Sequence, residues 1–337
     1  MPDLRSPLIA LLVLAATLAA CGCHSDATPP ATPTRQQEAP TVEDLRTAMA
    51  TLAPLHKKLG PPQPGDWLAR FHEPGQTFTE YLACDPVTPN EGRRVIYVQP
   101  LGEFTQQQRK IVTLTADFMG RFFHRPVIVR GDLSSGVIPP SARRTNPQTG
   151  QEQFLSTYVL DSVLPSRLAD DAAACIAFTP TDLWPGEGWN YVFGQASLRS
   201  RVGVWSLARN GDPAAGDEAF RLCLLRTIKT AVHETGHMFS MQHCTAWQCV
   251  MCGCNHLEES DRRPLALCPE CLAKVCWATG ADPLPRYRSL TAFCRDAGLE
   301  SERQFFEKSI AALVAADNSG RTGPAAAEAE ATQEPRP

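Results

Sequence analysis

The sequence predicts an α/β domain built on a mixed, twisted sheet, and three features of the chain support this fold class. Two short β-branched runs flank a stretch with helical periodicity, further strand-like runs precede a long helix, and a cysteine-dense segment follows that helix. A chain of 337 residues with 43% hydrophobic content is long enough to bury such a core.

The first strand-helix-strand unit lies between residues 94 and 131. Residues 94–98 and 126–129 are rich in Val, Ile and Tyr, which are typical of strands. This order favours a parallel pair of strands joined by a crossover helix. Apolar residues recur between the two runs at helical spacing, at Ile111, Leu114, Phe118 and Phe122.

Further strands are predicted at residues 174–178, 191–193 and 202–207, separated by turn sequences rich in Pro, Gly and Asn. Before them, residues 134–153 are predicted to form an exposed loop, and residues 154–168 show weak helical periodicity.

A long helix is predicted from Asp217 to Gly236, because apolar residues recur every four positions and no Gly or Pro interrupts them. Beyond residue 244 the chain is predicted to be irregular and dense in cysteine. A last helix is predicted over residues 301–315.

The two ends are predicted to lie outside the folded domain. Residues 21–44, rich in Pro and Thr, are expected to form a flexible tether, and residues 317–337 a disordered tail. The domain is placed at residues 45–316. Its upper part, residues 45–243, is expected to carry the sheet and the long helix, and its lower part, residues 244–316, the cysteines.

The first twenty residues are typical of an export signal. Arg5 supplies the positive charge, and residues 8–20 form an apolar run too short for a permanent membrane span. The run ends in Leu-Ala-Ala before Cys21, which resembles the bacterial lipoprotein signal, whose cysteine is lipidated. This resemblance implies the outer membrane, because Gly22 rather than Asp follows the cysteine. An ordinary secretory peptide with an incidental Cys21 is the alternative to an exported, lipid-anchored protein on the periplasmic side of that membrane.

The net charge of -4 argues against one class of partner. Proteins that follow a phosphate backbone carry a basic excess, which this sequence lacks. Nucleic acid is therefore not predicted as a partner.

The most informative motif is His233-Glu234-Thr235-Gly236-His237 at the end of the long helix. Residues four apart lie one above the other on an α-helix, so His233 and His237 can share one ion. Zinc prefers tetrahedral nitrogen and sulfur ligands, and a catalytic site leaves one position open for water, so a third ligand is expected nearby. His243 is the candidate.

His243 can reach the same ion only if the helix ends, because a continuing helix would place it about 240° around the axis from His237. The spacing of the three histidines resembles that of the metzincin metallopeptidases, in which a glycine at the position of Ser240 makes the turn with positive φ. A left-handed serine costs on the order of 1–2 kcal/mol, whereas structural zinc binding is worth about 10 kcal/mol or more. The turn is therefore expected to form despite Ser240.

Glu234 is the candidate general acid/base. A carboxylate beside the metal can take a proton from zinc-bound water and pass it to the leaving amine, while the ion polarises the scissile carbonyl. The motif therefore predicts a zinc metallopeptidase acting on a peptide or protein substrate. A chance motif with buried, hydrogen-bonded histidines is the alternative.

Two close cysteine pairs follow the histidines, Cys244 with Cys249 and Cys268 with Cys271. Such pairs suit a structural zinc site with four thiolates, although exported cysteines meet an oxidising environment and could form disulfides instead. Burial or disulfides are expected for the remaining cysteines of the predicted domain: Cys84, Cys175, Cys223, Cys252, Cys254, Cys276 and Cys294.

The string from His233 to Cys271 resembles the archaemetzincins, a metzincin branch with this histidine triad, four cysteines and an intervening methionine. The resemblance covers residues 90–275 and implies a metzincin-like zincin fold with a cysteine-rich lower part. It implies that Met251 underlies the site and that residues 182–209 include an edge strand that pairs with substrate. The implied zinc ligands are His233, His237 and His243 for a catalytic ion and Cys244, Cys249, Cys268 and Cys271 for a structural ion.

Two other functions compete with hydrolysis. The first is a lipoprotein that keeps zinc for its structure and binds peptides without cleaving them. Ser240 is the only residue that favours this function, and the presence of Glu234 argues against it. A disulfide-rich surface protein without metal would make the histidine spacing a coincidence. Cleavage of a peptide and a count of bound zinc separate these three hypotheses.

Overall fold

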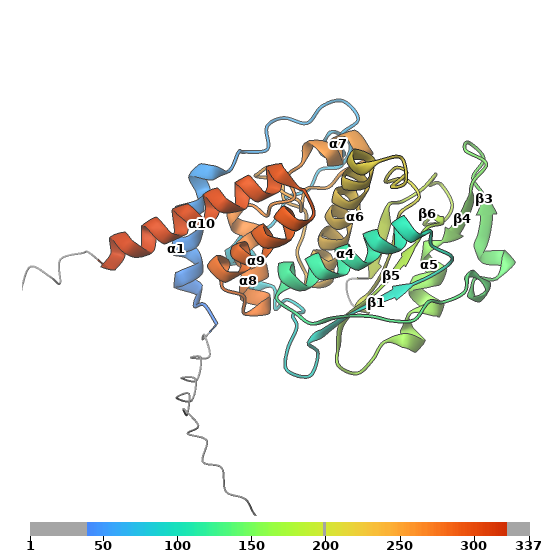
Figure 1. The fold of residues 1–337 in the computed structure, drawn as a ribbon, viewed down its shortest axis with the longest axis horizontal. Helices are drawn as coiled ribbons and strands as arrows, with labels where there is room; N and C mark the ends of the chain where they lie inside the picture. The colour runs from blue at the N-terminus through green and yellow to red at the C-terminus, as the bar shows by residue number, and fades with distance from the viewer. Residues whose placement is uncertain (1–38, 198–199, 322–337) are drawn as a thin grey trace, which may run out of the picture. The chain divides into compact units, whose positions relative to one another are not determined.

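The structure, a computed structural model, describes residues 39–197 and 200–321 (Figure 1). The predicted export signal, Cys21, residues 22–38 of the tether and residues 322–337 of the tail lie outside these ranges. Within the ranges, no helix combines the length and the apolar character needed to cross a bilayer.

The core is a five-stranded mixed sheet with the order β2-β1-β5-β8-β7. The first four of these strands run parallel, and β7 pairs antiparallel with β8 at one edge. The predicted mixed sheet is therefore confirmed. The bounds are Val95–Pro100 for β1, Val127–Val129 for β2, Ala172–Thr179 for β5, Gly194–Ser197 for β7 and Val202–Ser206 for β8.

The two faces of this sheet belong to different packing layers, because side chains alternate along a strand. Ile96 and Ile176 face the layer that contains α4 (Gln106–Phe123) and α6 (Asp217–Met238). Cys175 and Val204 face the opposite layer, which residues 154–164 cover. The predicted crossover helix between β1 and β2 is α4, and a capping box at Thr105 begins it.

A second, three-stranded sheet has the order β3-β4-β6. Its strands are Arg143–Thr145, Glu152–Leu155 and Asp182–Trp184. The prediction of an exposed loop over residues 134–153 was therefore wrong in its second half, where β3 and β4 form a hairpin. The buried side chain of Asn146 closes this hairpin by accepting from the backbone N–H groups of Gln148 and Thr149. The weakly periodic stretch that follows is helical from Ser156 to Arg167.

The strand predicted at residues 191–193 begins later than expected. Pairing with β8 starts at Gly194, opposite Trp205, and continues to Ser197. Tyr191 instead lies under the guanidinium of Arg209, 3.5 Å from the ring centroid, and Arg209 makes a two-pronged ion pair with buried Asp182. The next residue, Val192, forms an isolated antiparallel bridge with Leu183 of β6, so this segment pairs with the second sheet before β7 begins.

The segment after residue 244 is more regular than predicted, because three helices precede the last one. Capping signals explain two of them. Cys268 and Asp282 accept from backbone N–H groups of the first turn, and each is followed by proline at the first helical position. The helices are α7 (Leu257–Arg262), α8 (Pro269–Thr279), α9 (Pro283–Asp296) and α10 (Glu300–Arg321).

The ordered domain also extends beyond both predicted limits. At one end α10 continues through residues 317–321, which were assigned to the tail. At the other, a capping box between Thr41 and Asp44 begins α1 (Val42–Leu52), inside the predicted tether.

The N-terminal segment packs on the cysteine-rich part rather than on the sheet. Helix α1 contacts α8 and α10, and α3 (Phe78–Ala83) contacts α8. The carboxylate of Glu270 accepts from the backbone N–H of Phe78 at 2.6 Å. The predicted boundary between upper and lower parts therefore does not follow the order of the chain, because residues 42–83 join the lower part. Between α1 and α3, the short α2 (Trp67–Arg70) leads toward the histidine motif.

Candidate active site and metal centres

Helix α6 ends where the histidine spacing requires it to end. Ser240 adopts φ 64°, in the left-handed region, and Met241 donates its backbone N–H to the carbonyl of Gly236. The turn predicted at Ser240 is therefore present, with serine in the left-handed conformation. The Ser240 hydroxyl oxygen accepts from the backbone N–H of Val87 at 2.9 Å, a contact that a glycine could not make.

The turn brings the three predicted histidines together. Nε2 of His233 and Nε2 of His237 lie 3.0 Å apart, and one nitrogen of each histidine lies within 4.8 Å of the other two. A tetrahedral zinc with Zn–N bonds of about 2.0–2.1 Å separates its nitrogen ligands by roughly 3.3 Å. The three half-buried imidazoles of His233, His237 and His243 therefore fit one zinc ion.

The other nitrogen of each ring fixes the tautomer that zinc needs. Nδ1 of His233 lies 2.8 Å from the carbonyl oxygen of Val250, and Nδ1 of His237 lies 2.6 Å from that of Met241. Because a carbonyl only accepts, both Nδ1 atoms carry the proton and both Nε2 lone pairs face the site. Burial lowers the pKa of His233 to about 3, so its imidazole stays neutral.

The third histidine is oriented by a residue that the sequence did not reveal. Nδ1 of His243 lies 2.8 Å from Oε2 of Glu73 and 3.1 Å from Oε1. The indole of Trp67 stacks edge-on against the same imidazole, with 5.2 Å between ring centroids. Glu73 lies far from every recognisable motif, and no spacing in the sequence relates it to His243.

Glu234 faces the cleft from the same helix. The residue is half-buried, and burial raises the pKa of its carboxyl group above the usual range for glutamate. A carboxyl group with a raised pKa beside a zinc site is suited to accept and return a proton near neutral pH.

Met251 packs directly against α6. A methyl group added at Gly236, between the two histidines of the helix, would lie 2.8 Å from the Met251 sulfur. The backbone carbonyl of Met251 accepts from Cys244, and its neighbour Val250 holds His233. The turn at residues 249–252 therefore supports both the helix and the first histidine from below.

The four predicted cysteines form a second cluster. Their sulfur atoms are buried and lie within 4.8 Å of one another, with 3.7 Å between Sγ of Cys244 and Sγ of Cys268. A tetrahedral zinc with Zn–S bonds of about 2.3 Å separates its sulfur ligands by roughly 3.8 Å. Across residues 39–197 and 200–321 no disulfide is formed. The cluster therefore fits zinc rather than two disulfides.

Backbone N–H groups point at this sulfur cluster. Sγ of Cys249 accepts from the N–H of Met251 at 3.4 Å and from that of Cys268 at 3.2 Å. Sγ of Cys268 accepts from the N–H of Cys271 at the start of α8. These donors and the helix N-terminus favour thiolates, which are the forms that bind zinc.

A further acidic and histidine cluster, Asp66, His256 and Glu259, is saturated by protein donors. Asp66 pairs with Arg262 at 2.5 Å, and Glu259 pairs with Arg263 and accepts from the N–H of Trp67. These cations compensate the carboxylates, so the cluster anchors α2 on α7. The side chain of His256 caps α7 by accepting from the backbone N–H of Glu259.

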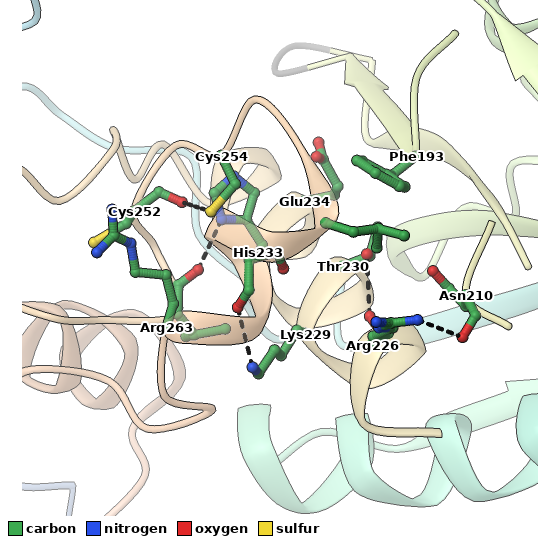
Figure 2. A pocket seen from close by; sticks show the side chains of 13 residues that line it. Phe193, Asn210, Arg226, Lys229, Thr230, His233, Glu234, Cys252, Cys254 and Arg263 are labelled. Atoms are coloured by element: carbon green, nitrogen blue, oxygen red, sulfur yellow. Dashed lines mark hydrogen bonds between the residues drawn. The ribbon is translucent and has the colours of Figure 1, made fainter. Parts of the chain in front are cut away.

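The histidines lie at the floor of a cleft of about 800 Å³. One wall is the sheet edge, where Gly194, Gln195 and Ala196 of β7 line the cleft. Trp67 and Phe71 of the N-terminal segment also line the cleft. A smaller pocket lies along α6 and shares His233 and Glu234 with the cleft (Figure 2).

Comparison with known proteins agrees with this geometry. The model of peptidase family M54 matches residues 172–276. Archaemetzincin-2 from Homo sapiens is 33% identical over 265 residues, which cover 69% of this chain and 73% of that protein. The chain belongs to the archaemetzincin family. It is a zinc metallopeptidase with a mixed α/β fold, as the sequence predicted.

Two archaeal archaemetzincins resemble a smaller share of the chain. The protein from Archaeoglobus fulgidus is 30% identical over 182 residues, which cover 53% of this chain and 98% of that protein. The crystal structure of the archaemetzincin from Methanopyrus kandleri aligns with 25% identity and a TM-score of 0.44, covering 56% of this chain and 96% of that one. In this archaemetzincin, Glu73 lies outside the residues that the family model matches.

Proposed function

We propose that this archaemetzincin hydrolyses peptide bonds with a zinc held by His233, His237 and His243 and with Glu234 as the general acid/base. The single observation that carries the proposal is the convergence of three neutral imidazoles, each fixed by a hydrogen bond at Nδ1, beside a carboxyl group with a raised pKa. Zinc bound there would polarise the scissile carbonyl and increase the acidity of the attacking water.

Glu234 handles the proton in this proposal. Its carboxylate takes a proton from the water as the water attacks the carbonyl carbon, and the same group then delivers a proton to the leaving nitrogen. A raised pKa makes both transfers accessible near neutral pH, because the pKa of the carboxyl group then lies closer to the pKa values of the attacking water and of the leaving nitrogen.

The edge strand β7 positions the substrate. Its free side faces the cleft, so an extended peptide can add to the sheet through backbone hydrogen bonds with residues 194–196. Such pairing holds the backbone above the histidines and leaves alternate side chains to enter the adjoining pockets.

The test compares the zinc-loaded protein with Glu234→Gln on a broad peptide library. We expect cleavage that a chelator abolishes and that Glu234→Gln lowers by on the order of 100-fold or more while both proteins keep their zinc. Zinc bound by the wild-type protein with no cleavage of any peptide would favour the inactive peptide-binding alternative.

We also propose that the protein is exported and lipid-anchored through Cys21. The support is the sequence alone, a short apolar run ending in small residues before a cysteine. Fractionation of bacterial cells tests it: the wild-type protein should follow the membranes, and Cys21→Ala should not. Equal distribution of both proteins would overturn the lipid anchor without affecting the proposed chemistry.

A further inference from the structure

The small pocket beside Glu234 contains a buried cation that the proposed reaction does not use. Lys229 lies one helical turn before His233 on α6, with 6% of its surface exposed, and lines this pocket together with Thr230 and Phe193. In Figure 2, Glu234 and Phe193 lie at the upper end of the pocket and Lys229 at its lower end. The pocket has a volume of about 80 Å³, enough for one short side chain.

The other two cations of the pocket are neutralised. Arg226 pairs with Asp261 through two contacts, and Arg263 pairs with Glu259 at 3.1 Å. Lys229 donates to the backbone carbonyl of Ser260 at 3.1 Å, but among the described residues no carboxylate lies within ion-pairing distance of its Nζ.

Among the described residues, the buried ammonium group of Lys229 donates only one hydrogen bond. Lysine carries three donors, and a buried charge without a counter-charge is costly. Burial accordingly lowers the pKa of the Lys229 ammonium group, and the carboxylates of Asp261 and Glu302, which lie beyond ion-pairing distance, offset only part of this effect. A carboxylate that enters the pocket would supply the missing acceptors and the missing charge, in a site where protein walls reduce screening by water.

The position of the pocket determines which part of a substrate reaches Lys229. The pocket and the main cleft share His233, Glu234, Phe193 and Cys254, so the pocket opens at the reacting groups. Glu234 must reach the nitrogen of the scissile bond, so the residue that contributes this nitrogen lies at the mouth of the pocket.

We propose that Lys229 selects substrates with a carboxylate on the leaving side of the scissile bond, supplied by an Asp or Glu side chain or by a peptide C-terminus. This inference rests on the proposed function and adds the substrate class. Lys229 is a specificity-determining residue: it contacts substrate but takes no part in proton transfer.

The first experiment uses peptides that differ only in the residue after the cleaved bond, which is Glu or Gln. For zinc-loaded wild-type protein, kcat/KM should be on the order of 30-fold higher for Glu than for Gln, because truncating one partner of a buried charge pair has an effect of this size. Lys229→Met, which keeps the stem and removes the charge, should bring the ratio close to one. Lys110→Met, an exposed lysine on α4, should keep the wild-type ratio.

A second arm identifies the source of the carboxylate. Each peptide is tested with a free and with an amidated C-terminus. Preference for Glu over Gln that survives amidation assigns the pocket to a side chain, whereas a rate that falls on amidation equally for Glu and Gln peptides assigns it to the terminal carboxylate. Equal kcat/KM for all four peptides, or an unchanged ratio in Lys229→Met, would overturn the inference.

A third arm separates this inference from the proposed function. Zinc-loaded Glu234→Gln is titrated with the same Glu and Gln peptides, and binding is followed by calorimetry. Tighter binding of Glu peptides that disappears in the double variant with Lys229→Met supports the pocket even if the wild-type protein cleaves nothing. Cleavage by wild-type protein without any Glu preference in rate or binding leaves the hydrolase intact and removes the role of Lys229.

Discussion

Oε2 of Glu73 lies 2.8 Å from Nδ1 of His243, across 170 positions of sequence. The contact brings the N-terminal segment to the histidine cluster, because Glu73 lies between α2, which donates a hydrogen bond to Glu259 of α7, and α3, which packs on α8. A carboxylate on the distal nitrogen of a ligand imidazole fixes its orientation and increases its basicity.

Glu73→Ala is expected to weaken zinc binding at the histidine site by about 10- to 100-fold, because His243 loses its orienting partner. Competition with a chelator of known affinity measures this change. The zinc affinity of Glu73→Gln should lie between those of Glu73→Ala and wild type, since an amide oxygen still accepts the hydrogen bond. Glu91→Ala, an exposed control, should bind zinc as wild type does. Unchanged affinity in Glu73→Ala would contradict the role of Glu73.

The Ser240 turn allows the backbone strain and the side-chain contact to be measured separately. Ser240→Ala keeps the left-handed residue and loses the bond to Val87, so it should lower the free energy of unfolding by about 1 kcal/mol. Ser240→Gly loses the same bond but relieves the strain, so it should be more stable than the alanine variant by on the order of 1 kcal/mol. Urea unfolding of the zinc-loaded variants gives both values. Equal stability of the two variants would argue against strain at this position.

The thiol cluster predicts a zinc count. Wild-type protein should bind two zinc ions per chain, and Cys249→Ser should lose the ion of the sulfur site together with much of the stability of the lower part. Metal analysis and thermal unfolding measure both effects. Cys84→Ser, which removes an exposed thiol, should change neither. Wild-type protein with one zinc and no free thiols among these four cysteines would show that disulfides replace the second metal.

His56 should make stability depend on pH. Its Nε2 atom is buried without a hydrogen-bond partner in the described part of the chain, its ring packs against Phe305, and burial lowers its pKa to about 4. The unfolded chain binds a proton near pH 6.5 and the folded chain only near pH 4, so stability present above pH 6.5 is lost as pH falls toward 4. When the pH is lowered from 7 to 5, the free energy of unfolding should therefore fall less for His56→Phe than for wild type, with zinc in excess for both proteins. Parallel losses would show that His56 does not titrate in this window.

Much of the catalytic geometry could be predicted from sequence, because it depends on local spacing. Four residues separate His233 from His237 on one helix, and a turn at Ser240 is the only way for His243 to join them. The order of β1, α4 and β2 was equally local, since each element carries its own periodicity.

The parts that could not be predicted depend on contacts between distant segments. Glu73 has no periodic or motif context, and only the packing of α1 and α3 on α8 brings it to His243. The start of β7 at Gly194 was missed because Val192 pairs with Leu183 of β6 and Tyr191 packs against Arg209, contacts with distant residues that strand propensity does not contain. Helices α8 and α9 do carry a local signal, a capping residue followed by proline at the first helical position. The density of cysteines in this part of the chain conceals it.

His243 and Cys244 are consecutive in the chain, yet one side chain belongs to the nitrogen cluster and the other to the sulfur cluster. Any event that displaces the sulfur of residue 244, such as oxidation of the thiols, must also move the imidazole next to it. Peptidase activity and the fold of the lower part therefore both depend on the thiol of residue 244, and an oxidant that never reaches the cleft could still inactivate the enzyme.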